Sequence, residues 1–407
     1  MQSATDDWQV LYIWPYLEWG GAQIYFTGII KEAREHYDVR AIMPLGSSER
    51  LLSYIRALDV PCEFFDAHID VSPAQTLWRK LKRRWRKATT ELAIVRYLGL
   101  SRLRRAILHV DFGPWSSFWF LLYLSLLSHV FVTLHTSIPK LAYLRRIEWK
   151  LKFSLLTLMP KFHLLASNRD MIQSLKNLLS EKAISEIRLA YSGVDRKEIE
   201  NALSVEIDRK TQCEKYKLPQ NFSFVFAMGQ FIERKGCWVL LDAARELHRR
   251  RPDVIFVWIA TGSLDVATKQ RIEAHNLGEA FRVMTSDEIG SGRLDLLLLL
   301  RLADVFVLPS FNEGLPVALL EAMALGKACV ASNINAIPEA VTDQETGLLV
   351  PPGDSRALAK AISLLLDDDA LRERIERSAQ ACAVNEFDER RAASTTVEMY
   401  NRCVQIA

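Results

Sequence analysis

The sequence is poor in cysteine, and its cysteines have no spacing typical of a metal site or a redox pair. There are six, with no C-x-x-C pair among them: Cys62, Cys213, Cys237, Cys329, Cys382 and Cys403. Most lie in apolar surroundings, which is typical of reduced, buried thiols in a cytoplasmic protein. The sequence therefore predicts no disulfide framework, no bound metal and a cytoplasmic location.

Long apolar runs are missing as well. No uninterrupted run reaches the roughly 18 residues that a membrane-spanning helix needs. The nearest approach is the stretch 115–127, whose serines favour a buried core helix. The first residues, MQSATDDWQ, carry acids where a secretion signal has bases, and no apolar segment follows them, so we expect no such signal.

The composition is that of a globular protein with an uneven charge. The chain has 407 residues, 49% apolar and 25% charged, which excludes disorder and leaves room for two domains. Residues 1–200 carry 28 Lys and Arg against 20 Asp and Glu, whereas the remainder carries 24 against 29. Residues 79–105 alone hold 11 basic side chains and one acid, Glu91. This excess indicates an anionic partner, either a membrane surface or a nucleic acid.

Strand and helix patterns alternate along the whole chain, which predicts an α/β fold with two doubly wound parallel sheets. The strands expected in the first half are 10–14, 39–44, 106–110, 129–133 and 162–166. Those expected in the second half are 222–228, 254–260, 281–284, 304–308 and 328–331. The polar stretch 204–216 separates the two sets, so we expect a domain boundary there.

One predicted helix contains a carboxylate that needs an explanation. In the segment 309–332, PSFNEGLPVALLEAMALGKACVAS, Glu321 is the only polar side chain between Pro316 and Leu325. A helix this apolar is buried, and a buried carboxylate needs a hydrogen-bond donor. Glu313 precedes the helix, at an N-terminus that favours an anion such as phosphate. One anion-binding terminus with two carboxylates suits a sugar nucleotide.

Glu313 and Glu321, eight residues apart, resemble the paired-glutamate signature of the family 4 glycosyltransferases, which are retaining enzymes of the GT-B fold. The alternative is an ordinary buried helix in which Glu321 pairs with an arginine elsewhere in the chain. The resemblance implies two Rossmann-like domains that face a cleft. Residues 1–205 would bind the acceptor, residues 206–385 would bind the nucleotide sugar, and the helix at 386–407 would pack back on the first domain.

The resemblance also implies roles for residues of the second domain. The segment GQFIERKG, residues 229–236, resembles a family motif in which an arginine and a lysine neutralise the diphosphate. Lys235 matches the lysine, but Gln230 replaces the arginine, and Arg234 is the nearest charged substitute. Glu313 and Lys235 are therefore expected to be catalytic. The residues expected to bind the donor here are Gly229, Gln230, Arg234, Gly314, Leu315, Pro316, Val317 and Glu321.

In the first domain, the resemblance points to two further features. Gly20 and Gly21 follow the first strand region and open a helix, where the family loop contacts the donor diphosphate. His135 ends the run 131–134, as does the family histidine near the donor sugar, and it is expected to be catalytic. Without the resemblance, two glycines indicate only a turn, and a lone histidine is more often structural.

Residues 78–95 predict a basic amphipathic helix. Its apolar stripe consists of Trp78, Leu81, Trp85, Ala88, Leu92 and Val95. The stripe could insert into an anionic membrane, or it could pack into the first domain with the charges solvated. The first alternative predicts a protein at the inner face of the cytoplasmic membrane, in contact through residues 78–105.

The sequence therefore predicts a metal-independent glycosyltransferase of the hexosyltransferase type. It would use no cofactor and would take its sugar from a UDP or GDP donor. The expected acceptor is a glycan or a lipid-linked intermediate of polysaccharide or lipopolysaccharide synthesis, and no nucleic-acid motif accompanies the basic charge. The alternatives are a sugar-nucleotide epimerase of the same fold and a non-catalytic partner protein that keeps the fold.

Overall fold

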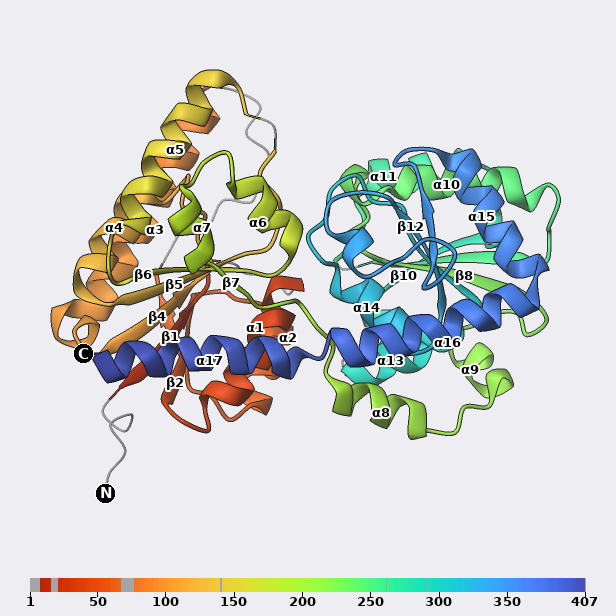
Figure 1. The fold of residues 1–407 in the computed structure, drawn as a ribbon. Coiled ribbons are helices and arrows are strands. Elements are labelled where there is room, and N and C mark those ends of the chain that lie inside the picture. Colours follow the sequence, from red (N-terminus) through yellow and green to blue (C-terminus); the bar gives the residue numbers. More distant parts are fainter. Residues whose placement is uncertain are drawn as a thin grey trace. The chain divides into compact units, whose positions relative to one another are not determined.

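The chain folds into two compact units in the computed structural model, and each unit is built on a parallel β-sheet (Figure 1). The first unit takes in residues 1–191 and 390–407, and the second takes in residues 192–389. Both units have the α/β class that the sequence predicts. The structure describes residues 8–15, 21–66, 77–139, 141–260, 262–290 and 292–406.

Seven strands of the described residues form the first sheet, in the spatial order β3-β2-β1-β4-β5-β6-β7, and all are parallel. They are β1 (Gln9–Ile13), β2 (Asp38–Pro44), β3 (Cys62–Phe65), β4 (Ala106–Val110), β5 (His129–Leu134), β6 (Phe162–Ala166) and β7 (Arg188–Leu189). Successive side chains of a strand point to opposite faces, so Leu11 and Ile13 enter one core while Val10 and Tyr12 enter another. Burial on both faces explains why these strands are apolar throughout.

Helices cover both faces of this sheet. One core is completed by α1 (Gly21–Ala33), α2 (Glu49–Ala57) and α17 (Glu389–Ile406). The other is completed by α3 (Leu77–Leu103), α4 (Phe118–Leu127), α5 (Tyr143–Thr157), α6 (Arg169–Leu175) and α7 (Glu181–Glu186). The last helix, α17, packs against the first sheet, because its Val397 and Tyr400 share a core with Tyr12.

The second sheet has six parallel strands among the described residues, in the order β10-β9-β8-β11-β12-β13. They are β8 (Ser223–Gly229), β9 (Val254–Ala260), β10 (Phe281–Thr285), β11 (Val305–Leu308), β12 (Ala328–Ser332) and β13 (Leu348–Val350). The α-helices of this unit are α8 (Arg196–Ser204), α9 (Arg209–Lys215), α10 (Cys237–His248), α11 (Val266–Glu273), α12 (Ser286–Ile289), α13 (Arg293–Leu300), α14 (Val317–Ala324), α15 (Ser355–Asp367) and α16 (Asp369–Glu386). Short 3₁₀ turns are η1 (Glu233–Lys235), η2 (Gly278–Ala280) and η3 (Ile337–Glu339).

The polar stretch 204–216 lies inside the second unit rather than between the units. Helix α8, just before it, buries Ile199 and Ala202, and Arg301 donates a hydrogen bond of 2.7 Å to the carbonyl of Ala202. The compact units therefore divide at residues 191–192, earlier than the polar composition indicates. The stretch itself forms helix α9 over Arg209–Lys215, so its polar composition marks a surface segment of the second unit and not a boundary.

Helix α4 is less buried than its apolar sequence predicts. Phe120, Leu121 and Leu124 are buried, whereas Trp119 is 77% exposed and Leu126 is 61% exposed. The prediction of a buried core helix is wrong for that side, because only one side of a helix can cover the sheet. None of the helices in the described ranges combines the length and the apolar character needed to span a bilayer.

Candidate functional site

Two glycines bring the segment after β8 against the end of β11. Gly229 ends β8 with a φ of 142°, and Gly236 follows η1 with a φ of 75°, both in the region that favours glycine. A Cβ on Gly236 would lie 1.9 Å from the carbonyl oxygen of Pro309. The glycines of GQFIERKG therefore allow Lys235 to reach the residues that follow β11.

Glu313 is buried among donors on this side of the second sheet. Its Oε1 accepts a hydrogen bond from Nζ of Lys235 at 2.5 Å and another from Oγ of Ser310 at 2.7 Å. Only 6% of Glu313 is exposed, so the carboxylate depends on these partners. The structure thus brings two predicted catalytic residues together. It also adds Ser310, which is not among the residues predicted from the sequence.

Helix α14 is buried almost all round, as predicted. It begins at Val317, and Pro316 occupies the N-cap position. Gly326 has a φ of 71° and follows the end of the helix, as its residue type predicts. Glu321 lies inside this helix and is 1% exposed.

The two oxygens of Glu321 have different surroundings. Oε1 accepts a hydrogen bond from Nη2 of Arg293, at the start of α13, while Nε of Arg293 donates to Glu198 at 3.1 Å. Oε2 is buried and has no hydrogen-bond partner in the described structure. Burial raises the pKa of Glu321, and Arg293 opposes this shift.

The two interpretations of Glu321, a ligand-binding carboxylate and a carboxylate paired with an arginine, thus each account for one of its oxygens. An arginine pairs with Oε1, as the alternative predicts, and Oε2 remains available to a hydroxyl donor. Arg293 is not among the site residues predicted from the sequence. A signal exists in the sequence, because Arg293 is the single cation of the apolar helix RLDLLLLL.

The turn into α14 offers backbone groups and few side chains. Leu315 and Val317 have buried side chains, and Pro316 has no N–H. The amides of Gly314, Leu315 and Val317 lie at or before the first helical turn, where the helix itself supplies no acceptor and its dipole is positive. This turn follows Glu313 directly and is suited to an oxygen-rich anion.

Gln230 and Arg234 are both exposed, but they have different contacts. The carbonyl of Gln230 accepts a bond from the amide of Ile232 at 2.9 Å. Nη1 of Arg234 donates to the carbonyl of Asn312 at 2.9 Å. The Arg234 guanidinium is therefore tied to the residue before Glu313, where its charge is available to the same site.

Two of the residues predicted in the first unit, Gly21 and His135, lie within the described ranges. Helix α1 begins at Gly21, whereas Gly20 lies outside the described residues. His135 follows β5, its carbonyl accepts a bond from Nδ2 of Asn168 at 2.9 Å, and its ring centre lies 4.9 Å from that of Tyr25. Burial lowers the pKa of His135 to about 4, so the imidazole is neutral at pH 7. Its Nε2 is buried without a partner in the described structure.

The apolar stripe of the basic helix is exposed. Trp78 is 77% exposed and Trp85 is 68% exposed, while Ile94, Leu98 and Leu103 of α3 enter the core. The exposed members of the stripe are Trp78, Leu81, Trp85, Ala88 and Leu92. The interpretation in which the stripe packs into the first domain is wrong for these five residues, and holds only for Val95.

The basic residues of this region divide into two groups. Arg102 donates to both oxygens of Glu63 at 2.6 and 2.8 Å, and this interaction lowers the pKa of Glu63 to about 2. Arg102 therefore has a structural role. Lys82, Arg83 and Arg84 are exposed near the N-terminal end of α3.

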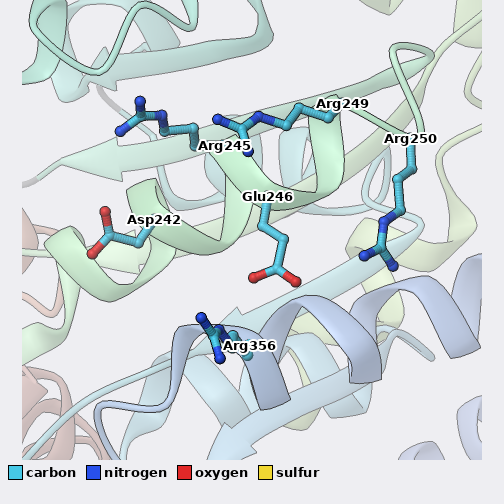
Figure 2. Close-up of a pocket in the computed structure, with 6 residues that line it drawn as sticks. All are labelled: Asp242, Arg245, Glu246, Arg249, Arg250 and Arg356. Atoms are coloured by element: carbon cyan, nitrogen blue, oxygen red, sulfur yellow. The ribbon is translucent and has the colours of Figure 1, made fainter.

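The second unit also has a basic groove, which is separate from the site around Lys235, Glu313 and Glu321. It has a volume of about 650 Å³ and is lined by Asp242, Arg245, Glu246, Arg249, Arg250 and Arg356 (Figure 2). Glu246 of α10 points toward Arg356 of α15 in this view. None of the residues that line the groove is Lys235, Glu313 or Glu321, so it is a separate surface feature.

Known proteins are similar to this chain over part of its length. The family model described as glycosyl transferases group 1 matches residues 208–381. The chain is 31% identical over 221 residues to D-inositol 3-phosphate glycosyltransferase of Paenarthrobacter aurescens, covering 54% of this chain and 53% of the relative. It is 35% identical over 212 residues to phosphatidyl-myo-inositol mannosyltransferase of Mycobacterium leprae, covering 51% and 54%. The chain thus matches about half the length of these curated relatives.

Solved structures extend the likeness of the fold to the whole chain. The crystal structure of Anabaena Alr3699/HepE in complex with UDP and glucose superposes with a TM-score of 0.73 at 17% identity, covering 96% of this chain and 99% of that one. The two units therefore define a protein of the GT-B glycosyltransferase fold. Within the second unit, residues 208–381 match the model of the group 1 glycosyltransferases.

Proposed function

We propose that this chain is a retaining glycosyltransferase of family 4, of the hexosyltransferase type, which moves a sugar from a UDP or GDP donor to an acceptor hydroxyl. The observation that carries the proposal is the buried Oε2 of Glu321, which lacks a hydrogen-bond donor within the segment that matches the family. An unpaired buried oxygen costs free energy, and a ligand hydroxyl removes that cost. The names of the two relatives, a glycosyltransferase and a mannosyltransferase, support the same reaction class.

In this proposal Lys235 and the turn into α14 bind the diphosphate. The Lys235 ammonium has three N–H donors and uses one of them on Glu313, so it can hold a phosphate oxygen at the same time. Negative charge builds on the phosphate oxygens as the glycosidic bond breaks. Lys235 and the amides of Gly314, Leu315 and Val317 stabilise that charge.

The two carboxylates have separate tasks. Glu321 accepts a hydrogen bond from a ribose hydroxyl through Oε2, and Glu313 accepts one from a hydroxyl of the donor sugar. From the first unit, the resemblance implies that Gly20 and Gly21 contact the diphosphate and that His135 lies near the donor sugar.

The proposed chemistry at the donor site uses no metal ion. Lys235 and the helix N-terminus balance the leaving-group charge, and Gln230 donates neutral hydrogen bonds where the family has an arginine. Arg234 supplies a further positive charge, because its guanidinium is held at the carbonyl of Asn312.

We infer that the acceptor is a glycan or a lipid-linked intermediate of polysaccharide or lipopolysaccharide synthesis. We also infer that the protein works as a peripheral protein at the inner face of the cytoplasmic membrane. The surface of α3 supports this, because Trp78 and Trp85 are exposed close in sequence to Arg83 and Arg84. Exposed tryptophan with basic residues is typical of a helix that lies in an anionic interface.

The neighbouring helices also expose apolar side chains. Helix α4 contacts both α3 and α5. The large exposed apolar residues of α4 and α5 are Trp119, Tyr123, Leu126, Tyr143, Leu144, Ile147, Leu151 and Leu155. An exposed apolar surface of this extent is typical of a membrane or protein contact, whereas single exposed apolar residues are ordinary.

A thermal-shift screen with UDP, GDP and ADP sugars tests the donor site. A ligand that binds only the folded state at a hundred times its Kd stabilises it by about 2.7 kcal/mol. Glu321→Ala should lose about half of this shift or more, and Glu273→Ala, which removes an exposed carboxylate of α11, should keep it. The donor site is refuted if no nucleotide stabilises the wild type.

Nucleotide release, measured with and without an acceptor glycan, separates the transferase from its alternatives. A transferase releases nucleotide faster when the acceptor is present. An epimerase alters the sugar without net release, and a non-catalytic partner protein binds the donor without converting it.

A further inference from the structure

Two histidines and a cysteine converge in the first unit at a site unrelated to the proposed donor chemistry. His129 begins β5, His163 is the second residue of β6, and Cys403 lies on α17. Nδ1 of His129 lies 3.1 Å from Nε2 of His163, and Sγ of Cys403 lies 3.4 Å from that same Nε2. One ligand atom from each residue lies within 4.8 Å of the other two, and Cys403 is 7% exposed.

Nε2 of His163 has two close polar neighbours but can form a good hydrogen bond with only one of them. Nε2 of a histidine carries either one proton or one lone pair, so it makes one good hydrogen bond. Here it faces both the imidazole of His129 and the thiol of Cys403. A cation between them would use a lone pair from each residue and leave no contact without a partner.

Two of the three separations are close to those of a tetrahedral ion of the zinc class. Zn–N bonds of about 2.0 Å and Zn–S bonds of about 2.3 Å place ligand atoms roughly 3.3 to 3.6 Å apart in a tetrahedron. The two separations at His163 lie close to that range. Imidazole and thiolate ligands also favour zinc and related transition metals over magnesium or calcium. Both histidines are partly exposed, so a water can fill the fourth position.

The geometry points to a binding site for one Zn²⁺-class ion formed by His129, His163 and Cys403, which ties the last helix to two neighbouring strands of the first sheet. Helix α17 follows the long second unit in sequence yet packs on the first sheet, so an ion at Cys403 fastens the C-terminal end of the chain (Figure 1). His129 and His163 lie at the amino ends of their strands. His135 lies at the opposite end of β5, where ligands of such sheets bind.

Titration of the full, reduced chain with Co²⁺ tests the site, because Co²⁺ reports its ligands spectroscopically. We expect one Co²⁺ per chain, visible bands of four-coordinate cobalt and a thiolate-to-cobalt charge-transfer band, all of which Zn²⁺ displaces. Cys403→Ser should lose the charge-transfer band and bind at least about tenfold more weakly. Cys62→Ser, a half-buried thiol of β3 in the same unit, should behave like wild type.

A second measurement tests the clamp itself. Zn²⁺ should slow amide hydrogen exchange at the C-terminal end of α17 in the wild type and in Cys62→Ser, but not in Cys403→Ser. The proposal is overturned if saturating Co²⁺ gives no charge-transfer band in the wild type. It is also overturned if the band persists in Cys403→Ser, because another thiol then binds the ion.

Discussion

Removing Lys235 should destabilise the protein more than neutralising Glu313 does. In Lys235→Met, the Glu313 carboxylate, which is 6% exposed, loses its bond from Lys235 and keeps the one from Ser310. Loss of one partner from a buried pair costs about 3 to 5 kcal/mol. The Lys235 side chain is 18% exposed, so water reaches that side and we expect about 3 kcal/mol. Glu313→Gln keeps an acceptor for Ser310, and its cost should be about 1 to 2 kcal/mol.

The double variant separates stability from catalysis. With both charges removed, no buried ion is left, and the cycle should give a coupling energy of about 2 kcal/mol. Free energies of unfolding from urea titrations of the four proteins measure it. The exposed pair Lys215 and Asp295 of the same unit, 3.1 Å apart, is the control and should couple by at most about 1 kcal/mol.

Turnover should not recover with stability. If Lys235 stabilises the leaving group, Lys235→Met should lower the rate about a hundredfold. The double variant should remain well below Glu313→Gln, because a stable fold does not replace the missing cation. If the double variant and Glu313→Gln turn over equally fast, Lys235 serves only to neutralise Glu313, and the assigned role is wrong.

Three further predictions concern the donor site and the membrane surface. Glu321→Ala should weaken nucleotide binding about 10- to 100-fold in calorimetry, because one hydrogen bond to a charged group is lost. Glu313→Ala should chiefly lower turnover. If the two variants change binding and turnover equally, the assignment is wrong. Gln230→Arg should leave the steady-state rate equal or higher, and a large loss would show that Gln230 has a role of its own. Arg83→Ser with Arg84→Ser should reduce sedimentation with anionic vesicles, since each basic residue near the surface contributes about 1 kcal/mol and high salt screens it. As a control, removal of two arginines from the groove in Figure 2 should have little effect on this sedimentation. The membrane proposal fails if the wild-type protein does not bind anionic vesicles at low salt.

The elements of the fold could be predicted because local patterns determine them. The strand predicted at 254–260 is β9 residue for residue, and β1 differs from its prediction by one residue at each end. Such strands are buried on both faces and stand out as continuous apolar runs. The two-residue strand β7 gives no such signal, because it is short and lies at the edge of its sheet.

The partner of Glu321 could not be predicted from the helix that contains it. The apolar sequence of α14 shows that a donor is required, but Arg293 lies 28 residues earlier, on another helix. Only the packing of the second unit brings them together. The same limit applies to the exposed side of α3. Periodicity identifies a stripe on a helix, and the tertiary structure decides whether Ile94 or Trp85 faces the core.

The proposed ion site changes what a chelator experiment means for the proposed reaction. If EDTA lowers wild-type activity, the ion could act on the leaving group or could only hold α17 on the first sheet. The Cys403→Ser variant distinguishes these causes, because it should lack the clamp whether or not EDTA is present. Metal-free chemistry at Lys235 requires that this variant keep the same activity with and without chelator, and that any wild-type loss follow a fall in its Tm. A loss of activity on chelation in Cys403→Ser would overturn the metal-free account, whereas the clamp itself is judged by the cobalt spectrum.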